Sequence, residues 1–229
     1  MTARMRHLRL TVLVALAVAL CVAPVAGTHD PDKDRGGAVI APAKAKWLGE
    51  FWAQIYSLPV AENPFAGHGR CLTVGHKVVQ AAGAPCTIER GSAFTLGFGT
   101  AWSNVEDPFP QTRVEQLALA LAADKQVVGM TVTVDGGHPV EIRTRRFELF
   151  SPQRTVLLPA DNILGLEGPQ TITLSAHGWG AVVRKLSVGE HTIVGDTRFA
   201  DGEPLIVEHI VTVVPKHDHD EGHGQQDDG

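Results

Sequence analysis

The alternation of apolar and polar positions predicts short β-strands over most of the chain. In residues 128–134 Met130, Val132 and Val134 alternate with threonines, and an Asp-Gly-Gly turn follows. Comparable runs rich in Val, Ile and Thr lie between Gly, Pro or Asp turns, at 93–98, 139–142, 146–150, 155–158, 171–174, 180–186, 191–194 and 205–214. This spacing predicts a mainly β fold: an antiparallel β-sandwich, Ig-like or jelly-roll-like, with one or two flanking helices.

The first expected helix has an aromatic side and begins near Trp47. The large apolar side chains of the segment WLGEFWAQIYSLP recur at helical spacing, and the helix is expected to end before Pro59. They are Trp47, Leu48, Phe51, Trp52 and Ile55. We expect this side of the helix to pack in the core.

The second expected helix follows Pro110. Thr112 and Glu115 have the spacing of a capping box, in which each side chain binds a backbone N–H of the other residue. Apolar residues then recur as in an amphipathic helix up to about Asp124, at Val114, Leu117, Ala118 and Leu121.

The N-terminus has the three parts of a secretory signal. Arg4, Arg6 and Arg9 precede an uncharged apolar run at 10–22, and small residues follow at 25–27. The run is shorter than the roughly 20 residues that a membrane helix needs. We therefore expect residues 1–27 to be cleaved and the protein to be secreted, or periplasmic in a cell with an outer membrane. We expect no membrane span in the mature form.

Two polar segments flank the expected β domain at 47–215. Residues 28–46 are charged and contain Gly and Pro, which predicts a flexible linker. Residues 216–229, KHDHDEGHGQQDDG, contain no apolar side chain, which predicts a disordered tail.

The charge of the mature chain argues against nucleic acid as a partner. Removing residues 1–27 takes away three Arg and no acid, so 17 Lys and Arg remain against 25 Asp and Glu, and the formal charge moves from −5 to −8. Binding to phosphates needs clustered Lys and Arg instead.

Cys71 and Cys86 are the cysteines of the mature chain. In an oxidising compartment the natural interpretation is a disulfide, and a loop of this length stabilises by roughly 3 kcal/mol.

Several motifs together resemble a family of secreted bacterial proteins of uncharacterised activity. They are FWAQIYSLPVAENPF, the paired cysteines, GSAFTLGFGTAWSNVED, VTVDGGHPVEI, VLLPADNILGL, LSVGEHTIVGDTRF and the terminal VEHIVTVV. The resemblance covers most of residues 47–214 in order. It implies export and a β-sandwich with one or two flanking helices, and it implies no activity.

Polar residues beside tryptophans suggest a ligand site. Indole rings next to carboxylate and amide groups hold sugars in many sandwiches. The candidates are Trp102, Asn104, Glu106 and Asp107, with His177 and Trp179 in an expected loop at 175–180. Core packing of both tryptophans is the alternative.

The tail is a candidate metal ligand. His217, His219 and His223 alternate with acidic residues, and neutral imidazole binds Zn, Ni and Cu. Nothing preorganises the segment, so we expect weak binding at most, and no cofactor otherwise. A solubilising acidic tail is the alternative.

No motif in the chain identifies a reaction. The sequence has no G-x-S-x-G elbow and no H-E-x-x-H helix. His209 shares a strand face with Val207, Val211 and Val213, and we expect a hydrogen-bonded core histidine there. We therefore expect a non-catalytic secreted protein that binds an extracellular glycan or protein through surface loops. The alternatives are metal binding by the tail, and a hydrolase or lyase for an extracellular polymer that uses Glu106, Asp107 and His177.

Overall fold

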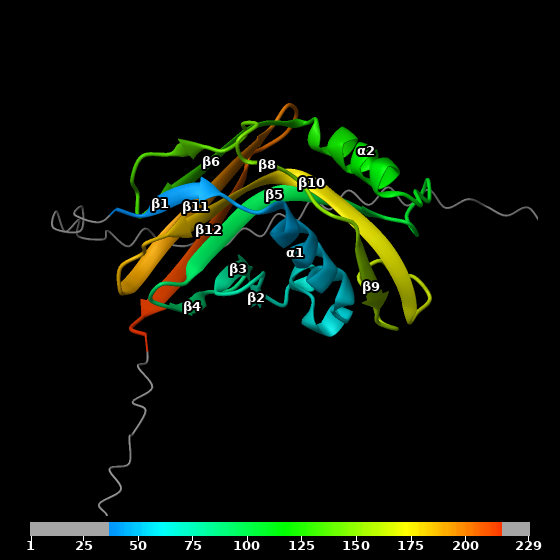
Figure 1. Ribbon diagram of the computed structural model, residues 1–229, viewed down its shortest axis with the longest axis horizontal. Coiled ribbons are helices and arrows are strands. Elements are labelled where there is room, and N and C mark those ends of the chain that lie inside the picture. The colour runs from blue at the N-terminus through cyan, green and yellow to red at the C-terminus, as the bar shows by residue number, and fades with distance from the viewer. Residues whose placement is uncertain (1–36, 217–229) are drawn as a thin grey trace, which may run out of the picture. The chain divides into compact units, whose positions relative to one another are not determined.

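The computed structural model describes residues 37–216, which are mainly β (Figure 1). The helices are α1 (Ala45–Ser57) and α2 (Arg113–Asp124), with 3-10 turns η2 (Val60–Glu62) and η3 (Pro64–Ala66). The strands are β1 (Val39–Pro42), β2 (Arg70–Thr73), β3 (Val78–Ala82), β4 (Cys86–Glu89), β5 (Ala93–Ser103), β6 (Val127–Val134), β7 (Val140–Glu141), β8 (Glu148–Phe150), β9 (Arg154–Leu158), β10 (Gln170–Arg184), β11 (Gly189–Phe199) and β12 (Leu205–Val214).

The strands form two mixed sheets. The first has the order β1-β10-β5-β3-β2, with β8 and β9 also paired to β10, and the second has the order β4-β12-β11-β6-β7. The expectation of purely antiparallel pairing is wrong at two places, because β3 runs parallel to β5 and β4 runs parallel to β12. Both exceptions involve the segment around the cysteines, which passes from one sheet to the other and for which the sequence pattern indicated no strand.

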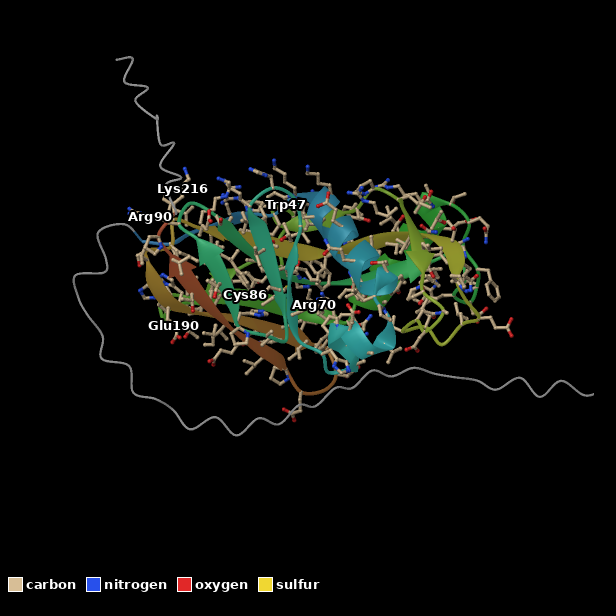
Figure 2. The ribbon with its side chains drawn as sticks, turned by 90° about the horizontal axis from the view of Figure 1, so that it is seen from below. Trp47, Arg70, Cys86, Arg90, Glu190 and Lys216 are labelled. Atoms are coloured by element: carbon tan, nitrogen blue, oxygen red, sulfur yellow. A yellow bond between two sulfur atoms is a disulfide. The ribbon has the colours of Figure 1, made fainter. Side chains whose placement is uncertain are left out.

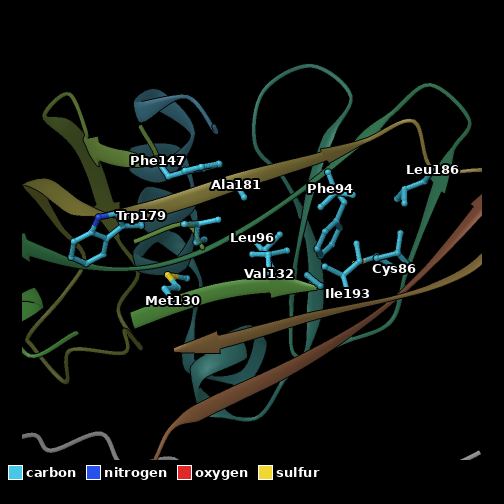
Figure 3. Close-up of a cluster of buried hydrophobic side chains, with 14 of the residues drawn as sticks. Cys86, Phe94, Leu96, Met130, Val132, Phe147, Trp179, Ala181, Leu186 and Ile193 are labelled. Carbon is cyan, nitrogen blue, oxygen red and sulfur yellow. The ribbon is translucent and has the colours of Figure 1, made fainter. Parts of the chain in front are cut away.

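One hydrophobic cluster fills the space between the two sheets (Figure 3). Phe94, Leu96 and Ala181 come from β5 and β10, and they meet Val132 and Ile193 from the second sheet. A second cluster lies on the opposite face of the first sheet, where α1 packs on β9 and β10. The first sheet is therefore covered on both faces.

Helix α1 confirms the expected aromatic side. Trp47, Phe51 and Ile55 are buried, and Leu48 and Trp52 are partly buried against the same cluster. The helix begins at Ala45, and β1 pairs with β10 just before it. The predicted linker at 28–46 is therefore wrong at its C-terminal end. The predicted signal peptide, the start of the linker and tail residues 217–229 lie outside the described residues.

Strand β10 runs continuously through the segment expected to be a loop. The two predicted strands at 171–174 and 180–186 are parts of one strand, and Gly178 in its middle pairs with Gly99 of β5. A Cβ at Gly178 would overlap the backbone of Phe98 and Gly99. Glycine here permits close approach of two strands and does not mark a turn.

The disulfide is confirmed. Cys71 in β2 and Cys86 in β4 are bonded, with Cα atoms 5.7 Å apart. Figure 2 shows Cys86 in the region where β2, β3 and β4 lie together. The bond ties the edge of the first sheet to the edge of the second.

Candidate functional site

Helix α2 begins with the predicted capping box. The backbone N–H groups of Gln111 and Thr112 donate to Glu115 Oε2 at 2.9 Å each, and the N–H of Glu115 donates to Thr112 Oγ1. The hydrogen bond from the Thr112 backbone is the largest of the effects that lower the pKa of Glu115. The start of α2 is therefore fixed by its own sequence.

The orientation of α2 is the reverse of an ordinary amphipathic helix. Its buried residues are Gln116, Ala120 and Asp124, which lie four residues apart on one side. The apolar residues that predicted the helix do not form its buried side: Val114 is 75% exposed and Leu121 37%. Ala118 and Ala122 are exposed as well, and Leu117 is half-buried.

Gln116 anchors the first half of the helix to β10. Its Nε2 donates to Thr173 O at 3.1 Å and to Thr173 Oγ1 at 3.2 Å. Its Oε1 accepts from Ser175 Oγ at 2.8 Å and from Gln153 Nε2 at 3.1 Å. Thr173 and Ser175 lie on the face of β10 that further along carries Trp179 and Ala181 into the core between the sheets.

Asp124 anchors the end of the helix. His177 Nδ1 lies 2.8 Å from Asp124 Oδ2, and Thr100 Oγ1 donates to Asp124 Oδ1 at 2.6 Å. His177 Nε2 lies 3.3 Å from Glu148 Oε1. We call Gln116, Asp124, Thr100, Thr173, Ser175 and His177 together the polar seam.

The charge state of His177 follows from these neighbours. Burial has the largest single effect and lowers its pKa, but the hydrogen bonds and charges of Asp124 and Glu148 together outweigh it, so the pKa of His177 is raised. The raised pKa favours the protonated imidazole, which in that form connects Asp124 of α2 and Glu148 of β8 to β10 electrostatically.

The surroundings of His177 indicate a structural role rather than a catalytic one. Its side chain is fully enclosed, and both ring nitrogens face carboxylates. Within residues 37–216 no hydroxyl or thiol forms a hydrogen bond with its Nε2, as a nucleophile paired with a general base would. The expected loop position of His177 and Trp179 is wrong, since both lie in β10 and Trp179 is only 7% exposed.

The loop before α2 is held rigid by the other candidate residues. Ser103 donates to Glu106 Oε2 through its N–H at 2.8 Å and through its Oγ at 2.6 Å, and Tyr56 donates to the same oxygen at 3.4 Å. Burial, and next the charge of Glu106, raise the pKa of Tyr56 well above its ordinary value. Asn104 Oδ1 accepts from Thr173 N–H at 2.8 Å.

These contacts leave little for a sugar to bind. The side chains of Asn104 and Glu106 are engaged within the protein, and Asp107 is exposed. Trp102 is half-buried with its Nε1 enclosed, and Trp179 lies in the core. The structure therefore keeps Trp102, Asn104, Glu106 and Asp107 near one loop, while His177 and Trp179 are buried elsewhere on β10.

Phe109 is the apolar side chain that this loop presents to solvent. It is 59% exposed, between Pro108 and Pro110, and has a φ of 60°, which bulky residues rarely adopt. Its N–H donates to Glu106 O, and its carbonyl accepts from Gln111 Nε2 at 2.8 Å. The ring is thus held outward by a fixed backbone. Sequence reasoning passed over Phe109, although an aromatic residue between two prolines in a polar loop could have indicated it.

A shallow groove joins this loop to the helix. Its volume is about 360 Å³, and it is lined by residues 108–111 together with Glu115, Ala118 and Leu119. We call Phe109, Val114, Ala118, Leu121 and Ala122 the outer face of α2. Figure 1 shows α2 on the outside of the curved pair formed by β5 and β10.

The other histidines have structural positions. His191 Nδ1 lies 2.7 Å from Asp135 Oδ2, and its Nε2 lies 2.9 Å from Ser187 O. His209 is half-buried, with its ring 5.4 Å from the ring of Phe94, and burial lowers its pKa to about 4. The expected hydrogen bond of His209 is absent among the described residues.

Residues 37–216 contain neither a cluster of metal-ligating side chains nor a membrane-spanning helix. No group of three or more His, Cys, Asp or Glu side chains is placed there to hold a metal ion. Neither α1 nor α2 has the length and apolar character of a membrane-spanning helix. His217, His219 and His223 lie outside the described residues.

Comparison with known proteins gives little beyond this geometry. No protein-family model and no curated protein matches the chain. The solution structure of amebosin is similar at 12% identity, covering 57% of this chain and 88% of that one, with a TM-score of 0.21. At that score the similarity carries no argument about fold or function.

Proposed function

We propose that this chain is a secreted, non-catalytic binding protein that recognises a partner polypeptide through the outer face of α2. The observation that carries the proposal is the reversed orientation of the helix: Gln116 and Asp124 face the sheet, while Val114 and Leu121 face solvent. A contiguous exposed apolar patch is typical of an interaction site.

The chemistry of the outer face favours a polypeptide over a glycan. Its side chains are apolar, with no exposed indole ring or free amide group to bind a sugar. Aromatic and aliphatic side chains beside a groove are suited to the apolar side of an amphipathic helix. Burying Phe109, Val114 and Leu121 would supply a few kcal/mol each at most, part of which is lost in ordering the complex. We therefore expect affinity in the micromolar range.

The proposal includes export and a sandwich architecture. The signal-like N-terminus supports export, and the Cys71–Cys86 disulfide is in keeping with an oxidising compartment. Two sheets that face each other across one core support an Ig-like or jelly-roll-like sandwich, of the kind that carries recognition surfaces on loops and flanking elements.

Selection of helical peptides tests the proposed function. Random 16-residue peptides would be displayed and selected on immobilised mature protein, and the enriched peptides titrated by calorimetry. We expect sequences with apolar residues at i, i+3 or i+4, and i+7, and loss of their binding in the Val114→Lys variant. The matched control is Val188→Lys, which changes a valine that is 46% exposed in the loop after β10.

Two results would contradict the proposed function. One is a selection that enriches no peptide. The other is a set of peptides that bind Val114→Lys and the unchanged protein with equal affinity, since they would then use a different surface.

A further inference from the structure

The segments that flank the described domain lack the side chains needed to cover the outer face of α2. Between the predicted cleavage site and β1, residues 28–36 read THDPDKDRG, and residues 217–229 read HDHDEGHGQQDDG. Neither contains an aliphatic or aromatic residue other than histidine. Covering an apolar face requires apolar side chains, so neither of these two segments is suited to cover it.

The outermost line of the helix consists of small residues. With 100° between successive residues, Ala118 and Ala122 lie opposite the buried Ala120. Val114 and Leu121 stand beside this line, and Phe109 lies beside the groove at the start of the helix. A second helix can therefore approach closely along the alanines while Val114 and Leu121, which stand on the same side of this line, pack along one side of it.

The charges at the two ends of the outer face are complementary to each other. Glu115 lies in the first turn, and Lys125 follows the last turn; both are exposed. A two-fold axis at the level of Ala120 would place two copies of α2 antiparallel, with Ala118 at the level of Ala122 of the second copy. Glu115 is then at the level of Lys125 of the second copy, within reach of that long side chain. A parallel pair would instead bring like charges and like helix ends together.

We propose that the partner of the outer face is a second copy of this chain, docked through α2 in the antiparallel arrangement. This inference rests on the proposed function, because it names the polypeptide that the surface binds. The groove beside Phe109 lies at the edge of the contact. Because the two copies are related by two-fold symmetry, Glu115 of each copy meets Lys125 of the other.

Cysteine cross-linking tests the register. Two variants of the mature chain, Ala118→Cys and Ala122→Cys, would be oxidised in glutathione buffer, separately and as an equimolar mixture. We expect the mixed pair to cross-link several-fold faster than either variant alone, because position 118 meets position 122 of the second copy. Faster cross-linking of each variant with itself overturns the antiparallel arrangement.

Sedimentation equilibrium of the unchanged mature chain tests the association itself. We expect a reversible dimer and a Kd about tenfold higher for Lys125→Glu, since two ion pairs per dimer become like-charge contacts. The matched control is Lys216→Glu, an equal charge change at an exposed lysine after β12, which should leave the Kd unchanged. A dimer that survives both Lys125→Glu and Val114→Lys uses another surface and overturns the inference.

The two proposals fail in different ways. A chain that stays monomeric at millimolar concentration overturns the dimer, but the proposed function stands if selected peptides still bind and Val114→Lys abolishes their binding. A monomer that also enriches no peptide contradicts both.

Discussion

Replacing Gln116 by leucine tests the reason for the reversed orientation of α2. On an ordinary amphipathic helix an apolar residue on the buried side is stabilising, and a glutamine there is costly. Gln116 is fully buried, however, and bonds to Thr173, Ser175 and Gln153. We expect Gln116→Leu to destabilise the protein.

The loss of unfolding free energy in Gln116→Leu depends on which hydrogen-bond partners of Gln116 are left without another partner. Thr173 O keeps the hydrogen bond from Asn104 N–H, and the exposed Gln153 amide can turn to water. The buried Ser175 hydroxyl has no other acceptor among the described residues, and an unsatisfied buried polar group costs about 1–3 kcal/mol. With the lost bonds to Thr173 added, we expect a loss of about 3 kcal/mol.

The reverse exchange on the same helix is the matched control. Val114→Gln places a glutamine at a position that is 75% exposed, where we expect a change within about 0.5 kcal/mol. Urea unfolding followed by tryptophan fluorescence measures both variants, and hydrogen exchange of the α2 amides shows whether the helix detaches first. If Gln116→Leu is as stable as the unchanged protein while Val114→Gln loses about 2 kcal/mol or more, buried polar contacts do not determine the orientation of α2.

Three other predictions concern separate parts of the chain. The pKa of His209 falls from about 6.5 in the unfolded chain to about 4 in the folded protein. Between pH 4 and pH 6.5 the unfolded chain therefore binds more protons than the folded protein. The free energy of unfolding should drop by up to about 3 kcal/mol as the pH falls to 4. Denaturant titrations at several pH values should show this drop reduced in His209→Leu, whereas the raised pKa of His177 acts in the opposite direction, stabilising at low pH, in both proteins. Replacing Cys71 and Cys86 by alanine should cost about 3 kcal/mol in urea unfolding, through release of a loop with a sequence separation of 15; a loss near zero would contradict the loop-closure argument. Calorimetry should find micromolar Zn or Ni binding that disappears on deletion of residues 216–229, with no change in Tm on metal addition; binding that survives the deletion would place the metal elsewhere.

Much of the fold could be predicted wherever a local pattern has one physical meaning. The strand at 205–214 was predicted with its observed bounds, because it begins after a proline and ends before another. The capping box of α2 was predicted from the spacing of Thr112 and Glu115, and the Cys71–Cys86 disulfide from the presence of two cysteines in an expected oxidising compartment.

The errors arose where a local signal has a second meaning in three dimensions. Gly178 suggests a turn in the sequence, but opposite Gly99 it serves the close approach of β5 and β10. Because a loop was expected there, His177 and Trp179, two of the six candidate ligand-site residues, were predicted at the surface, although both are buried in β10. Strands β2, β3 and β4 are only four or five residues long, too short for a pattern of alternation to stand out in the sequence, so their pairing partners define them.

The orientation of α2 could not be read from its apolar stripe because the deciding partners are distant in the sequence. Thr100, Thr173, Ser175 and His177 reach the helix only once β5 and β10 are paired. A hint was present in the sequence: Gln116 and Asp124 are eight residues apart and therefore lie near one side of a helix.

The polar seam explains why the outer face is exposed. A helix with Val114, Leu117 and Leu121 on one side could bury them by rotating about its axis, and the hydrophobic effect favours that rotation. Rotation would break the contacts of Gln116 and of Asp124 together, leaving the buried Ser175 hydroxyl without an acceptor and His177 Nδ1 without its carboxylate. Gln116 and Asp124 lie near the two ends of α2, so only one orientation of the helix about its axis keeps the hydrogen bonds of both residues. The exposure of Val114 and Leu121 is therefore imposed by buried polar groups, and a surface held open in this way is available to a partner without any rearrangement of the helix.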